Sequence, residues 1–159
     1  MEDIKEPFVM MLIGPTLSGK STYIRNFYPG TLTISRDEIV MEVFGSRDYN
    51  LAFKEVDQKE VDRVLAKRLR EANALKKSVI IDMTNMTVKR RMSTLRNFDE
   101  GFSRIAIVFP ILPGEEYARR NHERNAKESK WIPPFVIKSM IESYQEPSAE
   151  EGYDKITIL

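Results

Sequence analysis

Residues 8–21 read FVMMLIGPTLSGKS, and this stretch decides the fold class. Its first part, FVMMLI, is continuously apolar, which is typical of a strand buried on both faces of a parallel sheet. The second part, Gly14 to Ser21, satisfies the pattern G-x-x-x-x-G-K-[ST]. A helix is expected over residues 20–28 and ends before Pro29-Gly30. The pattern therefore lies between a buried strand and a helix, the context that a phosphate-binding loop requires.

The chemistry of this loop follows from its backbone. Glycines let successive N–H groups turn toward phosphate oxygens, and the helix behind them adds unpaired N–H groups and the positive end of its dipole. Lys20 would reach the β- and γ-phosphates, and the Ser21 hydroxyl would be a ligand of Mg²⁺. The loop thus predicts binding of a nucleoside triphosphate with Mg²⁺. The expected nucleotide-binding residues here are Gly14, Thr16, Ser18, Gly19, Lys20, Ser21 and Thr22.

Strands and helices alternate along the rest of the chain. Further strands are expected at residues 31–34, 79–81, 105–109 and 155–159, and helices at 54–75, 88–98, 115–128 and 135–144. This alternation predicts an α/β fold in which helices cover both faces of a parallel sheet. Because a domain has roughly 150 residues, the whole chain, 1–159, is expected to form a single domain.

Composition disfavours several other kinds of protein. The chain has no cysteine and one histidine, His122, which leaves no basis for thiol chemistry, cysteine-ligated zinc or a Ser-His-Asp triad. Its 25 basic and 24 acidic side chains sum to +1, too weak a field to bind nucleic acid indiscriminately. No apolar run reaches the roughly 20 residues that cross a bilayer, and the acidic start MEDIKE is unlike a signal peptide. A cytoplasmic protein is the simplest expectation.

Polar residues Ser35-Arg36-Asp37-Glu38 follow the strand expected at 31–34. At the carboxyl edge of a parallel sheet, a carboxylate beside the phosphate loop can accept the proton of an attacking hydroxyl. Asp37 is therefore a candidate general base, and Arg36 a candidate ligand of substrate phosphate. The alternative is structural, because Ser35 or Asp37 would also cap the helix that the following apolar positions predict.

The strand expected at 79–81 also ends in polar residues. Asp82, Thr84 and Asn85 are candidates for orienting a phosphate acceptor or, through water, a magnesium ion. An Asx or Thr turn at the end of the strand is the alternative.

Two arginines lie four residues apart on the helix expected at 115–128. Arg120 and Arg124 share one helix face, from which they can close over a triphosphate and neutralise charge on the transferred group. They belong to a stretch, 86–130, with ten basic and six acidic residues, a balance of +4. The alternative is a solvated helix whose arginines pair with Glu116 and Glu123.

Taken together, these segments resemble the 5′-hydroxyl polynucleotide kinases, a family typified by a bacteriophage enzyme and by the kinase modules of RNA-repair proteins. Matching segments occur in the same order over nearly the whole chain: GPTLSGKST (14–22), ISRDE (34–38), VIIDMTN (79–85), RNHER (120–124), IPPFVIKSM (132–140) and EPSAEEGYDKI (146–156). The R-D pair, the D-x-T-N turn and the R-N-x-x-R pattern carry the specificity, since the first segment is common to all phosphate-loop proteins.

The resemblance implies a P-loop fold with the sheet order 2-3-1-4-5 and a helical lid. It implies ATP- and Mg²⁺-dependent transfer of a phosphoryl group to the 5′-OH end of RNA or DNA, in nucleic-acid repair, in a pathway shared with a ligase or phosphatase. Asp37 would be the general base, Lys20 and Arg124 would stabilise the transferring phosphoryl group, and Arg120 would belong to the lid. Arg36, Asp82, Thr84 and Asn85 would face the acceptor.

The chain departs from the bacteriophage pattern at two acceptor-side positions. Val40 stands where that enzyme has an arginine, and Met83 stands where it has an acid. Related small-molecule kinases also carry an R-D pair and a D-x-T-N turn, so a kinase of a nucleoside or metabolite is the main alternative. A nucleotide-dependent switch without an acceptor is a further alternative.

Overall fold

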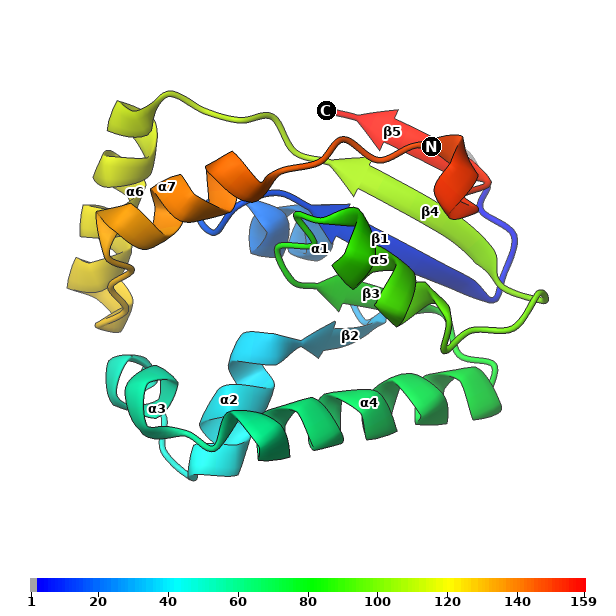
Figure 1. The fold of residues 1–159 in the computed structure, drawn as a ribbon, viewed down its shortest axis with the longest axis horizontal. Coiled ribbons are helices and arrows are strands. Elements are labelled where there is room, and N and C mark those ends of the chain that lie inside the picture. Colours follow the sequence, from blue (N-terminus) through cyan, green and yellow to red (C-terminus); the bar gives the residue numbers. More distant parts are fainter. Residues whose placement is uncertain (1–2) are drawn as a thin grey trace.

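The strand that follows from FVMMLI, β1 (Phe8–Ile13), is the centre of a five-stranded parallel sheet in the computed structural model, which describes residues 3–159 (Figure 1). The order is β2-β3-β1-β4-β5, as the resemblance implied. The other strands are β2 (Leu32–Ser35), β3 (Val79–Asp82), β4 (Ser103–Val108) and β5 (Lys155–Ile158). Met10 lies opposite Ile80 on one side and Ile105 on the other, so β1 is enclosed by two parallel neighbours.

Helices cover both faces of the sheet. On one face, α1 (Lys20–Phe27) packs on a cluster that includes Met10, Leu12 and Ile107. On the other face, α2 (Arg36–Phe44), α4 (Gln58–Ala74) and α5 (Val88–Leu95) enclose a larger core that includes Met11. The α/β class and the two-sided helical cover expected from the alternating pattern are thus confirmed.

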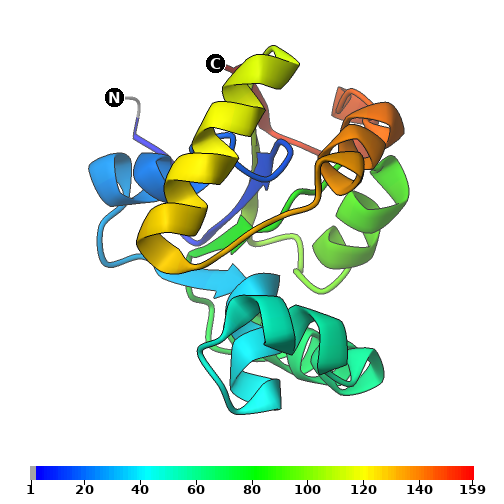
Figure 2. The same cartoon turned by 90° about the vertical axis from the view of Figure 1, so that its left-hand side faces the viewer.

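The remaining helices lie beyond the carboxyl ends of the strands. Figure 2 looks onto these ends, with α6 (Gly114–Glu128) and α7 (Pro134–Ser143) lying above α2 and α3 (Tyr49–Glu55). We call α6, α7 and the residues 129–133 between them the lid. A third apolar cluster, which contains Tyr49, Tyr117, Ile132 and Ile137, joins the lid to α3. A short 3₁₀ helix, Ala149–Glu151, precedes β5.

The expectation of one helix over residues 54–75 was wrong at its start. Helix α3 ends at Glu55, and Val56 has an extended backbone with φ −66° and ψ 148°. Asp57 then caps α4, its carboxylate accepting hydrogen bonds from the N–H groups of Lys59 and Glu60. An aspartate that caps a helix favours a new start over continuation, so two helices form where the apolar spacing predicts one.

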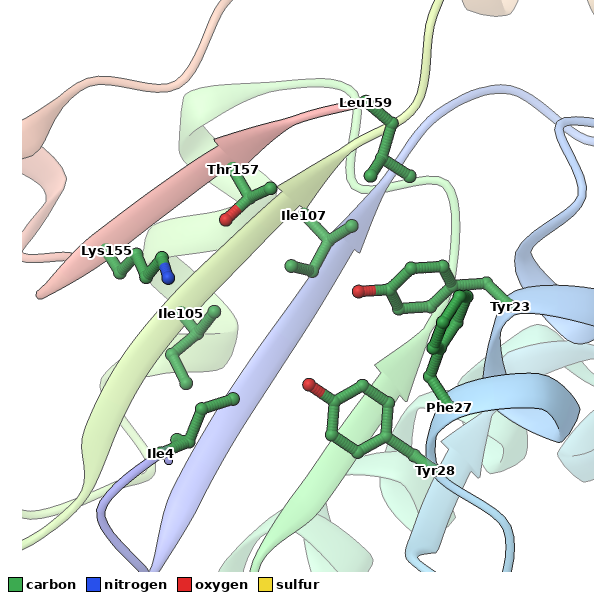
Figure 3. Close-up of a pocket in the computed structure, with 9 residues that line it drawn as sticks. All are labelled: Ile4, Tyr23, Phe27, Tyr28, Ile105, Ile107, Lys155, Thr157 and Leu159. Carbon is green, nitrogen blue, oxygen red and sulfur yellow. The ribbon is translucent and has the colours of Figure 1, made fainter. Parts of the chain in front are cut away.

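A cavity of about 400 Å³ lies on the α1 face of the sheet (Figure 3). The aromatic rings of Tyr23, Phe27 and Tyr28 face Ile105 and Ile107 of β4 across it. Its lining is mainly apolar and contains no acidic side chain. It is therefore not the charged site described below. In residues 3–159, no helix has the length and apolar character needed to cross a membrane.

Candidate active site

The phosphate loop connects β1 to α1 at the carboxyl edge of the sheet. Gly14 donates its N–H to the carbonyl of Thr84 at 3.0 Å, which ties the loop to the end of β3. A Cβ atom on Gly14 would lie 2.9 Å from Cβ of Phe109, so only glycine fits there. Gly19 has φ +95°, a left-handed conformation that glycine adopts without strain. The two glycines of the motif thus serve different needs, close packing and backbone conformation.

Lys20 is the first residue of α1 and is buried, with 9% of its surface exposed. Its Nζ donates to the carbonyls of Gly14 at 2.7 Å and Pro15 at 2.8 Å. Burial lowers the pKa of Lys20 to about 8, although the nearby carboxylates of Asp82 and Asp37 favour the charged form. The loop therefore surrounds an ammonium group that a phosphate would stabilise.

Asp37 lies in the first turn of α2 and does not cap this helix. The cap is Ser35, whose hydroxyl accepts from the N–H of Glu38 at 3.4 Å. The Asp37 carboxylate is instead bound by Lys130, with Nζ of Lys130 2.9 Å from Oδ2. Asp37 is close enough to Lys20 to influence its pKa. Ser35 therefore takes the capping role that was the structural alternative for Asp37. The Asp37 carboxylate is not used to cap α2.

Asp82 is the last residue of β3 and lies in register with Ser35 of β2. Burial raises the pKa of Asp82, and the charge of Lys20 opposes that rise. Thr84 contributes its carbonyl to the phosphate loop through the bond from Gly14. Asp37 and Asp82 are therefore two acids that follow or end adjoining strands at the same edge of the sheet, near Lys20.

Arg120 and Arg124 of α6 both reach the phosphate loop. Arg120 donates from Nη1 to the carbonyl of Leu17 at 2.9 Å and from Nε to Glu116 at 2.8 Å. Arg124 donates from Nη1 to the Thr16 hydroxyl at 3.4 Å. Its Nε and Nη2 are buried and have no hydrogen-bond partner within residues 3–159. Burial lowers the pKa of Arg124. Buried unpaired donors are costly, so this guanidinium fits an anion that spans the loop and α6.

Two residues assigned to the acceptor side have other partners. Arg36 donates to Asp62 at 2.7 Å and to Gln58 at 2.9 Å, both on α4. Asn85 is 2% exposed, and its amide donates to the carbonyls of Leu12, Ile81 and Met83. Asn85 therefore links the ends of β1 and β3 through its side-chain amide nitrogen.

The positions that depart from the bacteriophage pattern belong to the interior. Val40 is 1% exposed and packs in the core beneath α2. Met83 packs against the same core. Neither side chain therefore offers a charge to an acceptor.

Sequence reasoning missed three residues: one that binds Asp37, and two at the start of α3 that contact this residue or its neighbours in the chain. Lys130 lies in the lid, and Tyr49 and Asn50 begin α3. The Lys130 ammonium lies 4.0 Å from the centre of the Tyr49 ring. Asn50 binds the lid backbone, donating to the carbonyl of Ser129 and accepting from the N–H of Trp131, both at 3.0 Å. The sequence signals were weak: a lysine in a charged stretch and a short helix without clear periodicity.

The described residues contain no group of three or more His, Cys, Asp or Glu arranged to hold a metal ion. Ser21 lies on α1 directly after Lys20, with an exposed side chain. A single hydroxyl suits Mg²⁺ that arrives with a triphosphate, because Mg²⁺ commonly keeps several waters and binds through substrate phosphates.

Comparison with known proteins agrees with this geometry. A family model described as an AAA domain matches residues 9–147, which is most of the chain. The chain belongs to this family. As an AAA domain with an intact phosphate loop at the edge of a 2-3-1-4-5 sheet, it is a nucleotide-binding P-loop domain.

Solved structures with the same fold include several kinds of protein. A chain in the structure of the Pnkp1/Rnl/Hen1 RNA repair complex is 24% identical over 89% of this AAA domain, with a TM-score of 0.70. This chain spans 45% of that protein's length. A gluconokinase from Sinorhizobium meliloti 1021 is 15% identical, with coverage of 98% and 83% and a TM-score of 0.61. Chaetomium thermophilum Kti12, solved with ADP-AlF3, is 16% identical, with coverage of 95% and 88% and a TM-score of 0.66. These likenesses establish a P-loop kinase-like fold.

Proposed function

We propose that this protein is an ATP- and Mg²⁺-dependent kinase that phosphorylates the 5′-hydroxyl end of RNA or DNA. The observation that carries the kinase proposal is the buried guanidinium of Arg124, which contacts the phosphate loop through Nη1 and has no hydrogen-bond partner for Nε and Nη2 within residues 3–159. The charges of both Asp37 and Arg124 influence the pKa of Lys20. The site thus combines two cations for a triphosphate with a carboxylate for an alcohol.

In this mechanism the acceptor hydroxyl oxygen attacks the γ-phosphorus of ATP. A new O–P bond forms as the bond between the γ-phosphorus and the β–γ bridging oxygen breaks, and ADP leaves. Asp37 accepts the hydroxyl proton. Lys20 and Arg124 neutralise charge on the phosphoryl oxygens, and Arg120 holds α6 against the loop through Leu17. Ser21 would help to hold Mg²⁺, which would supply further neutralisation of the phosphate charge.

The choice of a polynucleotide acceptor rests on the ordered series of segments shared with the 5′-hydroxyl polynucleotide kinases. The likeness to a chain of an RNA repair complex supports the same choice. We therefore propose a role in nucleic-acid repair beside a ligase or phosphatase. Among the candidate residues, we propose that Asp82 and Thr84 face the acceptor.

A kinase of a nucleoside or other small metabolite is the second candidate. Two observations favour it: the formal charge is only +1, and position 40 is a buried valine instead of a cation. A polynucleotide acceptor gripped through its phosphates would bind more weakly as salt rises, whereas a neutral small acceptor would not.

The decisive experiment incubates the protein with ATP labelled in the γ-phosphate, Mg²⁺, and a panel of 5′-OH oligonucleotides, nucleosides and sugars. Transfer to oligonucleotides that weakens with added salt would support the proposal. Transfer only to small acceptors would replace it with the second candidate, and release of free phosphate without transfer would indicate a nucleotide switch.

The Asp37→Asn variant tests the proposed base. It should lower turnover by about 100-fold or more, because general-base catalysis contributes about 10² to 10⁴, while leaving ATP affinity nearly unchanged. Glu38→Gln is the matched control, since this neighbouring carboxylate is exposed and paired with Arg47. An active Asp37→Asn variant would remove Asp37 from the mechanism.

A further inference from the structure

We infer that Lys130 is a positioning residue for the proposed general base, and that docking of the lid on α3 delivers it to Asp37. This inference rests on the proposed kinase function and adds a residue that the sequence pattern did not single out. Lys130 is 93 positions from Asp37 along the chain, so their contact exists only in the folded protein.

The Lys130 ammonium has a restricted position. Its side chain is 17% exposed, and Nζ lies between Oδ2 of Asp37 at 2.9 Å and the Tyr49 ring at 4.0 Å. Tyr49 is itself 6% exposed. A partly buried, charge-assisted hydrogen bond holds its partner more firmly than an exposed ion pair does, and the aromatic face adds a cation–π attraction.

This arrangement leaves one side of the Asp37 carboxylate open. Lys130 binds Oδ2, and within residues 3–159 no group donates a hydrogen bond to Oδ1. A general base needs a lone pair directed at the proton that it removes, at about 2.6–3.2 Å between heavy atoms. Fixing one carboxylate oxygen orients the other, so Lys130 can position Asp37 without blocking the acceptor hydroxyl.

Asn50 fixes the backbone on both sides of Lys130. Its amide group binds the carbonyl of Ser129 and the N–H of Trp131, each at 3.0 Å. Ser129, with φ 54° and ψ 39°, ends α6 and turns the chain toward α3. One side chain at the start of α3 thus holds the lid segment that carries Lys130.

Charge balance gives Lys130 a role that Lys20 cannot fill during the reaction. Asp37 lies near a second acid, Asp82, and the cations Lys20, Lys130 and Arg124 offset their charge. When a triphosphate occupies the loop, its anionic charge competes with Asp37 for Lys20 and Arg124. Lys130 then remains as the counter-ion that holds the Asp37 carboxylate in place.

The first test is kinetic and uses the full chain with the acceptor that the panel identifies. Lys130→Met keeps an unbranched side chain against Tyr49 but removes the charge; we expect kcat to fall about 10- to 100-fold, as misplacement of a reacting group does, with KM for ATP within about twofold. Lys130→Arg should restore at least about one third of the activity. Lys138→Met, at an exposed lysine of α7 paired with Glu142, should be neutral.

The second test links Asn50 to Lys130. Asn50→Ala should also lower kcat. The kcat of the double variant Asn50→Ala/Lys130→Met should be no lower than that of Lys130→Met, because Asn50 acts through Lys130. Trp131 is the only tryptophan, so its fluorescence reports directly on this segment. Acrylamide should quench it more strongly in Asn50→Ala, at unchanged thermal stability.

These measurements separate the inference from the proposed function. If the parent protein transfers phosphate to no acceptor, the kinase proposal fails, while the Trp131 quenching still tests whether Asn50 holds the segment. If the parent is active, equal losses in Lys130→Met and Lys138→Met, no recovery in Lys130→Arg, or additive losses in the double variant would each overturn the inference.

Discussion

At the scale of single residues, Lys20 makes nucleotide binding depend on pH. Burial lowers its pKa to about 8, and bound phosphate favours the charged form, so ATP binding takes up a proton above that pH. The affinity is therefore full below about pH 8 and is lost as the pH rises, up to about tenfold per unit. Titration calorimetry from about pH 7.5 to about pH 10 measures this slope. Lys20→Met should bind ATP weakly with no such slope, and a slope that persists would belong to another group.

Gly14 gives a second prediction at this scale. In Gly14→Ala the new methyl group would meet Cβ of Phe109 at 2.9 Å and Oγ of Ser18 at 3.0 Å. We expect a loss of about 1–3 kcal/mol in the free energy of unfolding, and weaker ATP binding because the loop must shift. Gly114→Ala is the control, since nothing lies within 4 Å of a Cβ there. Equal denaturation midpoints for the two variants would contradict the packing argument.

At the scale of elements, a buried ion pair joins α5 to the segment before β5. Arg91 is 0% exposed and binds Glu151 through two bonds, Nε to Oε1 at 2.7 Å and Nη2 to Oε2 at 3.2 Å. Its Nη1 also donates to the carbonyl of Asn85 at 2.9 Å. Arg91→Leu should cost about 3–5 kcal/mol in urea unfolding, because it leaves the Glu151 carboxylate buried without its partner.

The double variant Arg91→Leu/Glu151→Leu separates the two causes of that loss. Removing both charges should recover much of the stability, since two apolar groups can replace a buried pair at small cost. If the free energy of unfolding of Arg91→Leu lies within about 1 kcal/mol of the parent value, the Glu151 carboxylate must bind water or another donor instead.

At the scale of the whole molecule, the phosphate loop and the lid meet through Arg124. We expect its buried Nε and Nη2, which have no hydrogen-bond partner within residues 3–159, to lower the stability of the protein without nucleotide, because an unmade hydrogen bond in the interior costs about 1–3 kcal/mol. Arg124→Met should therefore unfold at an equal or higher temperature than the parent without nucleotide. It should also lose most of the stabilisation by Mg-ATP, which in the parent reaches about 2.7 kcal/mol at a concentration of 100 times Kd.

Differential scanning calorimetry with and without Mg-ATP measures both effects. Arg119→Met is the comparison, since Arg119 is on the same helix but exposed and paired with Glu116 and Glu123. An Arg124→Met variant that is less stable without nucleotide, and that responds fully to Mg-ATP, would assign the arginine to packing.

The phosphate loop and the fold class could be predicted from local sequence because their physics is local. The apolar run 8–13 has to be buried, and Gly14, Gly19 and Lys20 serve the loop over a few neighbouring positions. The strand order came from the family resemblance. Helix boundaries were less accessible: α3 ends at Glu55, and Asp57 caps α4 through hydrogen bonds that the apolar spacing does not reveal.

The candidate site required tertiary structure to select among residues of similar appearance. Ser35 and Asp37 were equally suited to cap α2, and the hydrogen bond to Glu38 N–H assigned the cap to Ser35. Arg36 and Arg124 are both arginines near strand or helix ends. Arg36 nevertheless pairs with Asp62 of α4, whereas Arg124 faces the phosphate loop.

The sequence by itself determined that a phosphate loop follows a buried strand in an α/β domain, because hydrophobic burial and backbone conformation depend on residues near one another in the chain. Only the tertiary structure decided that Lys130 binds Asp37, that Tyr49 packs against Lys130 and that Asn50 binds the backbone beside it. These residues come from different elements, and an ion pair or a cation–π contact depends on distances that arise only when the lid packs against α3.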